Sequence, residues 1–156
     1  LAEGAGLIHW MGLWSDEPYM IPACDFNYLI GPKEFERICL PDIAREVETV
    51  GRAVFHLDGP GATNHVDALL EIPQLTAIQY VTGAGTPSAL PWIDMYRKIQ
   101  KKNRSLVICC PPDEILKVAN LLEPEGVIFT PFGGDKGWDS LDDIFKALCK
   151  TFGTKC

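Results

Sequence analysis

His56 and Asp58 stand two residues apart at the end of an apolar, strand-like run, Ala53–Leu57. Side chains two residues apart in a strand point to the same side of the sheet. An imidazole beside a carboxylate can act as an oriented general acid or base, and the same two groups can bind a divalent metal. The spacing therefore predicts a catalytic or metal-binding pair. The simpler interpretation is a polar strand end, with Asp58 capping the turn at Gly59.

Three other residues are candidates for the same site. Asp25 follows the apolar segment 19–23, so it would be either a catalytic carboxylate at a strand end or the cap of a turn or helix. Gln79 lies inside an apolar strand, where a buried amide needs hydrogen-bond partners from a ligand or from a neighbouring strand. Trp14, like Trp10, could wall a binding pocket for a flat substrate, or it could pack in the core or an interface.

The cysteines and the remaining histidines give weaker signals. The six cysteines include no Cys-x-x-Cys pair and lack the spacing of a disulfide framework, which favours a reducing, cytoplasmic compartment. Cys109 and Cys110 are adjacent, so we expect one to face the helices and the other to face the opposite side of the strand. His65, beside Asn64 and Asp67, is expected on the surface of a helix.

Apolar, β-branched runs alternate with stretches of helical period, and this alternation must position the candidate residues. The expected strands are 53–57, 77–81, 105–110 and 126–130. The expected helices are 62–70, 91–102, 113–122 and 141–152, together with an earlier helix at 32–50 that Pro41 should kink or restart. Two upstream apolar pieces, 6–14 and 19–24, also look strand-like. Strands that are apolar throughout are buried on both faces, as in a parallel sheet.

The alternation predicts a single α/β domain over residues 1–156, with parallel βα units. Two architectures fit, an open doubly wound sheet and a portion of a TIM (β/α)8 barrel, which needs about 250 residues when complete. The chain would hold the C-terminal part of such a barrel. A half-barrel has two exposed strand edges, so we expect a homo-oligomer in which a dimer partner covers them, or a missing N-terminal half.

Charge and hydropathy exclude some partners. The chain carries 14 Lys and Arg against 21 Asp and Glu, a formal net charge of −7. This acidic balance argues against a nucleic-acid partner, which needs a basic face. No apolar run reaches the length of about 20 residues that spans a bilayer, so we expect no membrane partner.

Three stretches resemble the uroporphyrinogen decarboxylase-like superfamily, which includes the cobalamin-dependent (corrinoid) methyltransferases. They are Ala-Val-Phe-His-Leu-Asp-Gly-Pro-Gly at 53–61, Glu-Phe-Glu-Arg-Ile-Cys-Leu-Pro at 34–41, and Leu-Leu-Glu-Ile-Pro at 69–73 followed by Ala-Ile-Gln-Tyr and Gly-Ala-Gly at 77–80 and 83–85. The resemblance implies the C-terminal portion of a TIM barrel. It also implies methyl transfer linked to a corrinoid protein, with a small-molecule substrate.

The resemblance further implies a zinc site, from which this chain departs. The methyltransferase branch binds zinc with His-x-Cys and a distant second cysteine, and the matching pair here is His56-x-Asp58. The distant cysteine would fall near 130–135, where only Asp135 could replace it. The alternatives are a porphyrinogen decarboxylase, whose substrate-binding strands are not in this chain, and a truncated barrel that acts as an interaction module. A third is an open sheet that binds an anionic ligand.

Overall fold

A computed structural model of the protein describes residues 6–85, 88–133 and 137–154. Its centre is a parallel sheet of four strands in the order β3-β4-β5-β6, which is their order along the chain. The strands are β3 (Ala53–Asp58), β4 (Leu75–Val81), β5 (Ser105–Cys110) and β6 (Val127–Pro131). All four strands predicted from the apolar runs are therefore confirmed, with the bounds of β5 unchanged and those of the other three shifted by one or two residues.

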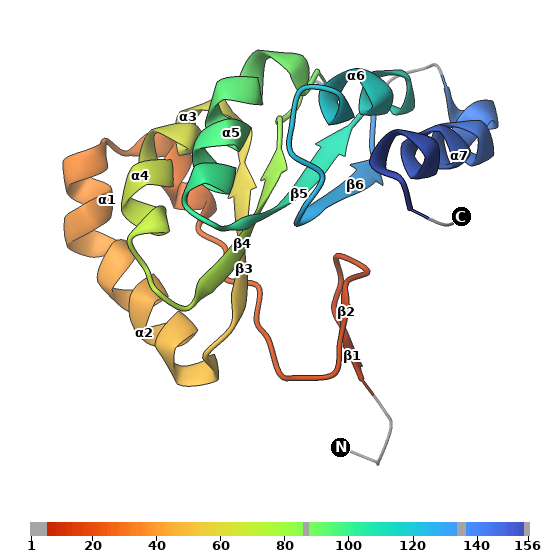
Figure 1. Ribbon diagram of the computed structural model, residues 1–156. Coiled ribbons are helices and arrows are strands. Elements are labelled where there is room, and N and C mark those ends of the chain that lie inside the picture. Colours follow the sequence, from red (N-terminus) through yellow and green to blue (C-terminus); the bar gives the residue numbers. More distant parts are fainter. Residues whose placement is uncertain (1–5, 86–87, 134–136, 155–156) are drawn as a thin grey trace.

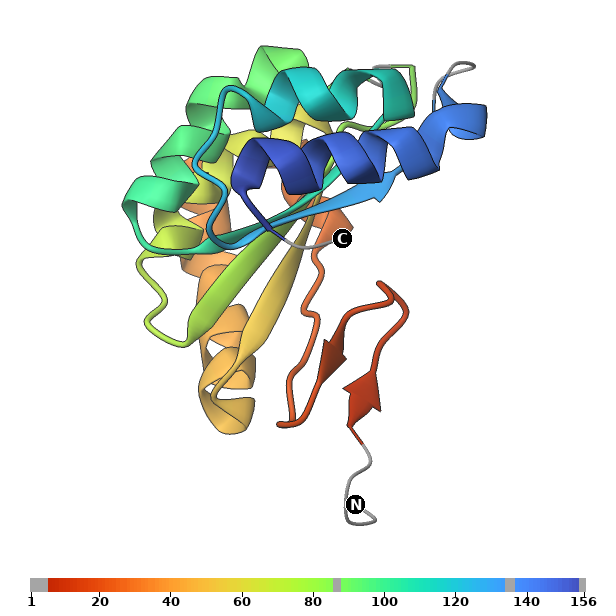
Figure 2. The same ribbon diagram turned by 45° about the vertical axis from the view of Figure 1, so that its right-hand side comes forward.

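Helices connect the strands and lie together on one face of the sheet (Figures 1 and 2). The α-helices are α1 (Pro32–Ile38), α2 (Leu40–Val50), α3 (Gly59–Ala62), α4 (Val66–Leu70), α5 (Ile93–Lys101), α6 (Ile115–Ala119) and α7 (Leu141–Phe152). Single 3-10 turns are η1 (Asp25–Leu29), η2 (Thr63–His65), η3 (Leu90–Trp92), η4 (Pro112–Glu114) and η5 (Trp138–Ser140). Most of the buried apolar side chains lie between these helices and the sheet.

The long helix expected at 32–50 is two helices, α1 and α2, which meet at Cys39. Each begins with proline in its first turn, Pro32 and Pro41, where the missing backbone N–H costs no helical hydrogen bond. The expected restart at Pro41 is thus confirmed. Gly51 ends α2 with a φ of 81°, which a residue with a side chain rarely adopts.

A further extended segment runs parallel to β3 on the side away from β4. Met20 pairs with Ala53 and Ala23 pairs with His56. The amide of Val54 donates to the carbonyl of Met20 over 3.0 Å, and the amide of His56 donates to the carbonyl of Pro22 over 2.9 Å. The strand-like piece predicted at 19–24 therefore extends the parallel sheet by a short, irregular edge.

Among the described strands the spatial order never reverses. A doubly wound sheet places helices on both faces and has a switch point where the strand order reverses. In this sheet the helices cover one face only, as both views show (Figures 1 and 2). Over the described residues the fold is therefore α/β and its sheet is singly wound. This arrangement argues against an open sheet that binds a ligand at a switch point.

The opposite face of the sheet is partly covered by a small hairpin, β1 (Leu7–Ile8) and β2 (Trp14–Ser15), which pair antiparallel. We had expected the 6–14 stretch to form one strand-like run, but Gly12, with a φ of 73°, helps it to turn back on itself. Tyr19 anchors the turn, because its hydroxyl donates to the carbonyl of Leu13 over 2.6 Å and accepts from the amide of His9 over 3.1 Å.

A small second core lies between this hairpin and the sheet. Tyr19, Val54, Ala77 and Val107 are buried there. No helix within the described ranges is both long enough and apolar enough to cross a bilayer.

Candidate functional site

A row of polar side chains crosses the face of the sheet that the helices leave open. His56 on β3 is in register with Gln79 on β4, and Cys109 on β5 lies on the same face of the sheet. His56 Nδ1 lies 2.6 Å from Gln79 Oε1, and Gln79 Nε2 donates to Cys109 Sγ over 3.6 Å. Parallel pairing in this register is what brings three residues far apart in the sequence into one row.

The hydrogen bond to Gln79 fixes the tautomer of His56. An amide oxygen can only accept, so the proton of the bond must be on Nδ1 of the imidazole. The lone pair of a neutral imidazole is then on Nε2, and no described residue is hydrogen-bonded to that atom. The ring of Trp10, in the hairpin, meets the imidazole at 81°, with 5.2 Å between the ring centroids. His56 as a whole is half-buried.

Gln79 is buried, with 4% of its surface exposed. Its amide oxygen and nitrogen both bond side chains of neighbouring strands. Gln79 would therefore act on a ligand indirectly, by orienting the imidazole of His56. The sequence left open whether this amide bonds a ligand or another strand, and the structure places it between two strands. We had expected Asp58 to orient His56, but among the described residues Gln79 is the imidazole's hydrogen-bond partner.

Cys109 and Cys110 face opposite sides of β5, as expected from their adjacency. Cys110 packs in the helix-covered core, and Cys109 touches Gln79 on the open face. Burial is the main cause that raises the pKa of Cys109 to about 11, and the charge of Asp58 also raises it, against the opposing effect of the Gln79 hydrogen bond. The thiol is therefore protonated at neutral pH, which argues against a catalytic thiolate.

Asp25 and Asp58 lie together in a shallow pocket of about 450 Å³ at the carboxyl end of the strands. Tyr28 and Gly59 also line it. Asp58 ends β3, and Asp25 begins η1 directly after the edge segment, so parallel strands deliver both carboxylates to one rim. No ion pair joins either carboxylate to another described residue, and none of the described lining residues of the pocket is Lys or Arg. The prediction that both lie at strand ends is confirmed.

His65 is not on the surface, contrary to the prediction from its polar neighbours. Only 1% of it is exposed, and its ring stacks on Phe35 with 4.2 Å between the centroids. Its Nε2 donates to the carbonyl of Asn27 over 2.8 Å, because a carbonyl can only accept. Asn27 lies in η1, so His65 holds the turn that carries Asp25 and Tyr28. The sequence missed this role because His65 lies in η2, a 3-10 turn too short for a buried face to be recognised from its pattern.

The two tryptophans of the hairpin lie in different places. Trp10, not Trp14, contacts His56. Trp14 is 67% exposed and lines a separate pocket of about 440 Å³ between the hairpin and the sheet, whose floor includes Val54, Val107 and Ile128. That pocket reaches the amino ends of the strands, so a flat ligand held by Trp14 would lie away from the Asp25–Asp58 rim.

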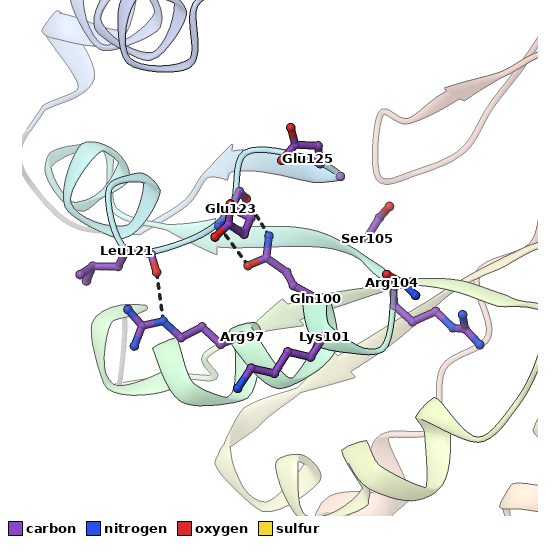
Figure 3. A pocket seen from close by; sticks show the side chains of 10 residues that line it. Arg97, Gln100, Lys101, Arg104, Ser105, Leu121, Glu123 and Glu125 are labelled. Carbon is purple, nitrogen blue, oxygen red and sulfur yellow. Dashed lines mark hydrogen bonds between the residues drawn. The ribbon is translucent and has the colours of Figure 1, made fainter.

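A larger pocket, of about 530 Å³, lies at the amino ends of β5 and β6 (Figure 3). Two of its polar side chains, those of Gln100 and Arg97, bind backbone atoms of the loop before β6. Gln100 donates to the carbonyl of Glu123 over 2.6 Å and accepts from its amide over 3.3 Å, and Arg97 donates to the carbonyl of Leu121 over 3.1 Å. These bonds tie α5 to the loop before β6. We therefore regard this pocket as a structural connection rather than a candidate site.

The described residues contain no group of three or more His, Cys, Asp or Glu side chains that could hold a metal ion. The expected donors, His56 and Asp58, project from the same face of β3. Asp135, the other expected donor, lies outside the described residues. Neutral His56 offers Nε2 as a donor while an amide oxygen holds Nδ1–H, an arrangement that metal-binding histidines commonly have.

Gly61 lies in α3 and allows the 3-10 turn η1, which carries Asp25 and Tyr28, to pack closely against this helix. A Cβ at this position would lie 2.8 Å from the carbonyl oxygen of Tyr28 and 2.9 Å from its ring. We expect Gly61→Ala to lower the free energy of unfolding by about 1–3 kcal/mol, because the backbone of η1 must move to admit the methyl group. Urea unfolding of the two proteins measures this difference.

Gly31→Ala is the matched control for Gly61→Ala. Its Cβ would meet only the flexible end of the Glu34 side chain, so its cost should stay below about 1 kcal/mol, that of alanine in place of glycine at the N-cap of α1. Equal stability of the Gly61 and Gly31 variants would contradict the close packing of Tyr28 on Gly61.

No protein-family model matches the chain, and no curated protein or solved structure is significantly similar to it.

Proposed function

We propose that the chain is the C-terminal part of a TIM (β/α)8 barrel and an enzyme domain with its site at the carboxyl end of the strands. Strands in chain order with helices on one face support the barrel, whose interior would be the open face of the sheet. TIM-barrel enzymes place their chemistry at the carboxyl ends of the strands. The rim with Asp25 and Asp58 lies at that end. His56, two residues before Asp58 in β3, projects from the same face of the sheet.

One observation carries the acid–base part of the proposal. His56 is held by Gln79 through Nδ1–H, and its Nε2 is left as a proton acceptor on the open face. A positioned imidazole that is oriented by a second group is the usual arrangement of a general base. The imidazolium formed after proton uptake would share a strand face with the Asp58 carboxylate.

The reaction that we propose is methyl transfer between a corrinoid on a partner protein and a small-molecule acceptor. The choice of reaction rests on the resemblance of residues 53–61 to the uroporphyrinogen decarboxylase-like superfamily. When bound, the corrinoid supplies an electrophilic methyl group. An acceptor such as a thiol must lose its proton to become a nucleophile, and His56 Nε2 takes that proton. Asp25 and Asp58 would hold the acceptor at the rim.

Methylcobalamin and a small thiol test this proposal directly. We expect the protein to accelerate loss of the cobalt-bound methyl group above the rate in buffer, followed by the change in the visible spectrum of the corrinoid. His9→Ala, a substitution in the exposed part of the hairpin, should leave that rate unchanged. No acceleration would contradict methyl transfer. Release of carbon dioxide from a porphyrinogen instead would favour the decarboxylase alternative.

A divalent metal on His56 Nε2 and Asp58 is the second candidate for this site. The hydrogen bond that holds Nδ1–H on an amide oxygen favours it, because that bond sets the tautomer that a metal requires. Among the described residues these two groups would be its only protein donors. Metal analysis of the intact protein and of His56→Ala decides between the two roles, since a metal held by Nε2 is present in the first and lost in the second.

A further inference from the structure

The hairpin β1–β2 contacts the candidate site through Trp10, which lies in its turn. The indole ring meets the imidazole of His56 at 81°, with 5.2 Å between the ring centroids, while 61% of Trp10 remains exposed. An edge-to-face contact of two rings is a weak attraction. The indole can therefore shield one side of the imidazole and still be released from it reversibly.

The hairpin is attached to the rest of the protein by few interactions. Each of its strands has two residues, and Leu7, Met11 and Leu13 are only partly buried where they pack against the small second core. In the described part of the chain, the backbone hydrogen bonds that tie this region to β3 begin at Met20. A cavity of about 440 Å³ lies between the hairpin and the sheet. The hairpin can thus move without disturbing the main core.

Tyr19 holds the hairpin in its present position. Its hydroxyl joins both sides of the turn, because it donates to the carbonyl of Leu13 over 2.6 Å and accepts from the amide of His9 over 3.1 Å. Its ring is buried in the second core, and the next residue, Met20, pairs with Ala53 at the start of β3. The hydroxyl of Tyr19 is therefore a latch between the turn that carries Trp10 and the fixed sheet.

We propose that the hairpin, residues 7–15, is a lid whose Trp10 controls the access of small molecules to the imidazole of His56. In the closed state, which the structure shows, Trp10 lies against the imidazole and the Tyr19 hydroxyl holds the turn. In the open state the turn moves away from the sheet, on the side opposite to the helices, and a ligand reaches His56 (Figure 2). The hinge is the loop between β2 and Tyr19, residues 16–18.

The lid belongs to the site on which the proposed function rests, but its test needs no substrate and no methyl transfer. Access to His56 can be measured while the protein is inactive, and activity can be absent while the lid works. Either proposal can therefore fail alone.

Diethylpyrocarbonate, which acylates unprotonated imidazole nitrogens, measures this access. At about pH 8 an ordinary imidazole is neutral, so differences in rate report access rather than protonation. Tandem mass spectrometry of peptides follows each histidine separately. In the original protein we expect His56 to react more slowly than the exposed His9 and faster than His65, of which 1% is exposed.

Three variants make the measurement specific. Trp10→Ala removes the shield and should speed the modification of His56, by about tenfold if the closed lid is open in about one molecule in ten. Tyr19→Phe keeps Trp10 and the buried ring but removes the latch, so it should also speed the reaction. Trp14→Ala removes the same kind of side chain from β2, where it does not contact His56, and should leave the rate unchanged.

Hydrogen exchange gives a second readout of the latch. The amide of Gly12 donates to the carbonyl of His9 over 2.8 Å, within the hairpin. In Tyr19→Phe this amide should exchange faster. The amides of Val54 and His56, which donate to the edge segment 20–22, should exchange as in the original protein.

Four results would overturn the proposal. An unchanged rate at His56 in Trp10→Ala would remove the shield, and an equal gain in Trp14→Ala would mean that Trp10 has no special role. Unchanged exchange of the hairpin amide in Tyr19→Phe would remove the latch. A matching gain at the buried His65 would show that the whole domain opens rather than the lid.

Discussion

Replacing His56 by alanine is expected to lower the rate of the proposed methyl transfer by about 10²–10⁴-fold, the usual contribution of a positioned base. The loss follows from Nε2, the acceptor that the Gln79 hydrogen bond leaves free. His56 is half-buried and lies outside the main core, so the variant should fold with an unchanged circular dichroism spectrum. The rate of methylcobalamin demethylation, at a fixed concentration of thiol, measures the effect.

Two companion measurements separate a base from a structural residue. Free imidazole in the buffer should restore part of the rate to His56→Ala, because it can enter the space and accept the same proton. Gln79→Leu removes the acceptor for the Nδ1–H of His56, so it should lower the rate of methyl transfer. Gln79→Glu keeps an acceptor at this position, so it should retain a higher rate than Gln79→Leu. An unchanged rate in His56→Ala, or a loss that imidazole does not relieve, would contradict the role of general base.

Phe55→Ala should have the largest effect on stability, a loss of about 3–5 kcal/mol in the free energy of unfolding. Phe55 is fully buried in β3, between the sheet and the helices, so its removal leaves a cavity in the main core. Small domains are stable by about 5–15 kcal/mol, so the variant would lose a large share of that margin. The urea midpoint should fall while the slope of the transition stays the same.

Phe145→Ala is the matched control for this variant. It removes the same side chain from α7, where the ring is 56% exposed, and should change stability by about 0.5 kcal/mol or less. A loss at Phe55 no larger than that at Phe145 would mean that the main core does not lie between β3 and the helices.

The elements were predictable because their signals are local. An apolar run such as 105–110 indicates a buried strand by itself, and the proline at position 41 marks the restart of a helix in its own neighbourhood. The rim was also predictable, since Asp58 ends a strand, Asp25 follows an extended segment parallel to it, and parallel strands end on one side.

The partners within the site were not predictable because they depend on pairing between distant strands. The bond from His56 to Gln79 follows from a register that joins residues 23 apart in the sequence. The edge contact of Trp10 depends on the hairpin folding back over the sheet, and the burial of His65 depends on the position of α1. A single sequence contains none of this information directly.

The outer side of β6 has a consequence for solubility. Among the described strands β6 is the last of its sheet, so its backbone donors and acceptors on that side have no strand to meet, and Ile128 beside them is 47% exposed. Such an edge can recruit strands from other molecules in an open-ended series. Pro131 ends β6 and has no amide hydrogen, so it cannot donate the last backbone hydrogen bond to an added strand. Slow fibrillar association at high protein concentration would therefore begin at residues 127–130.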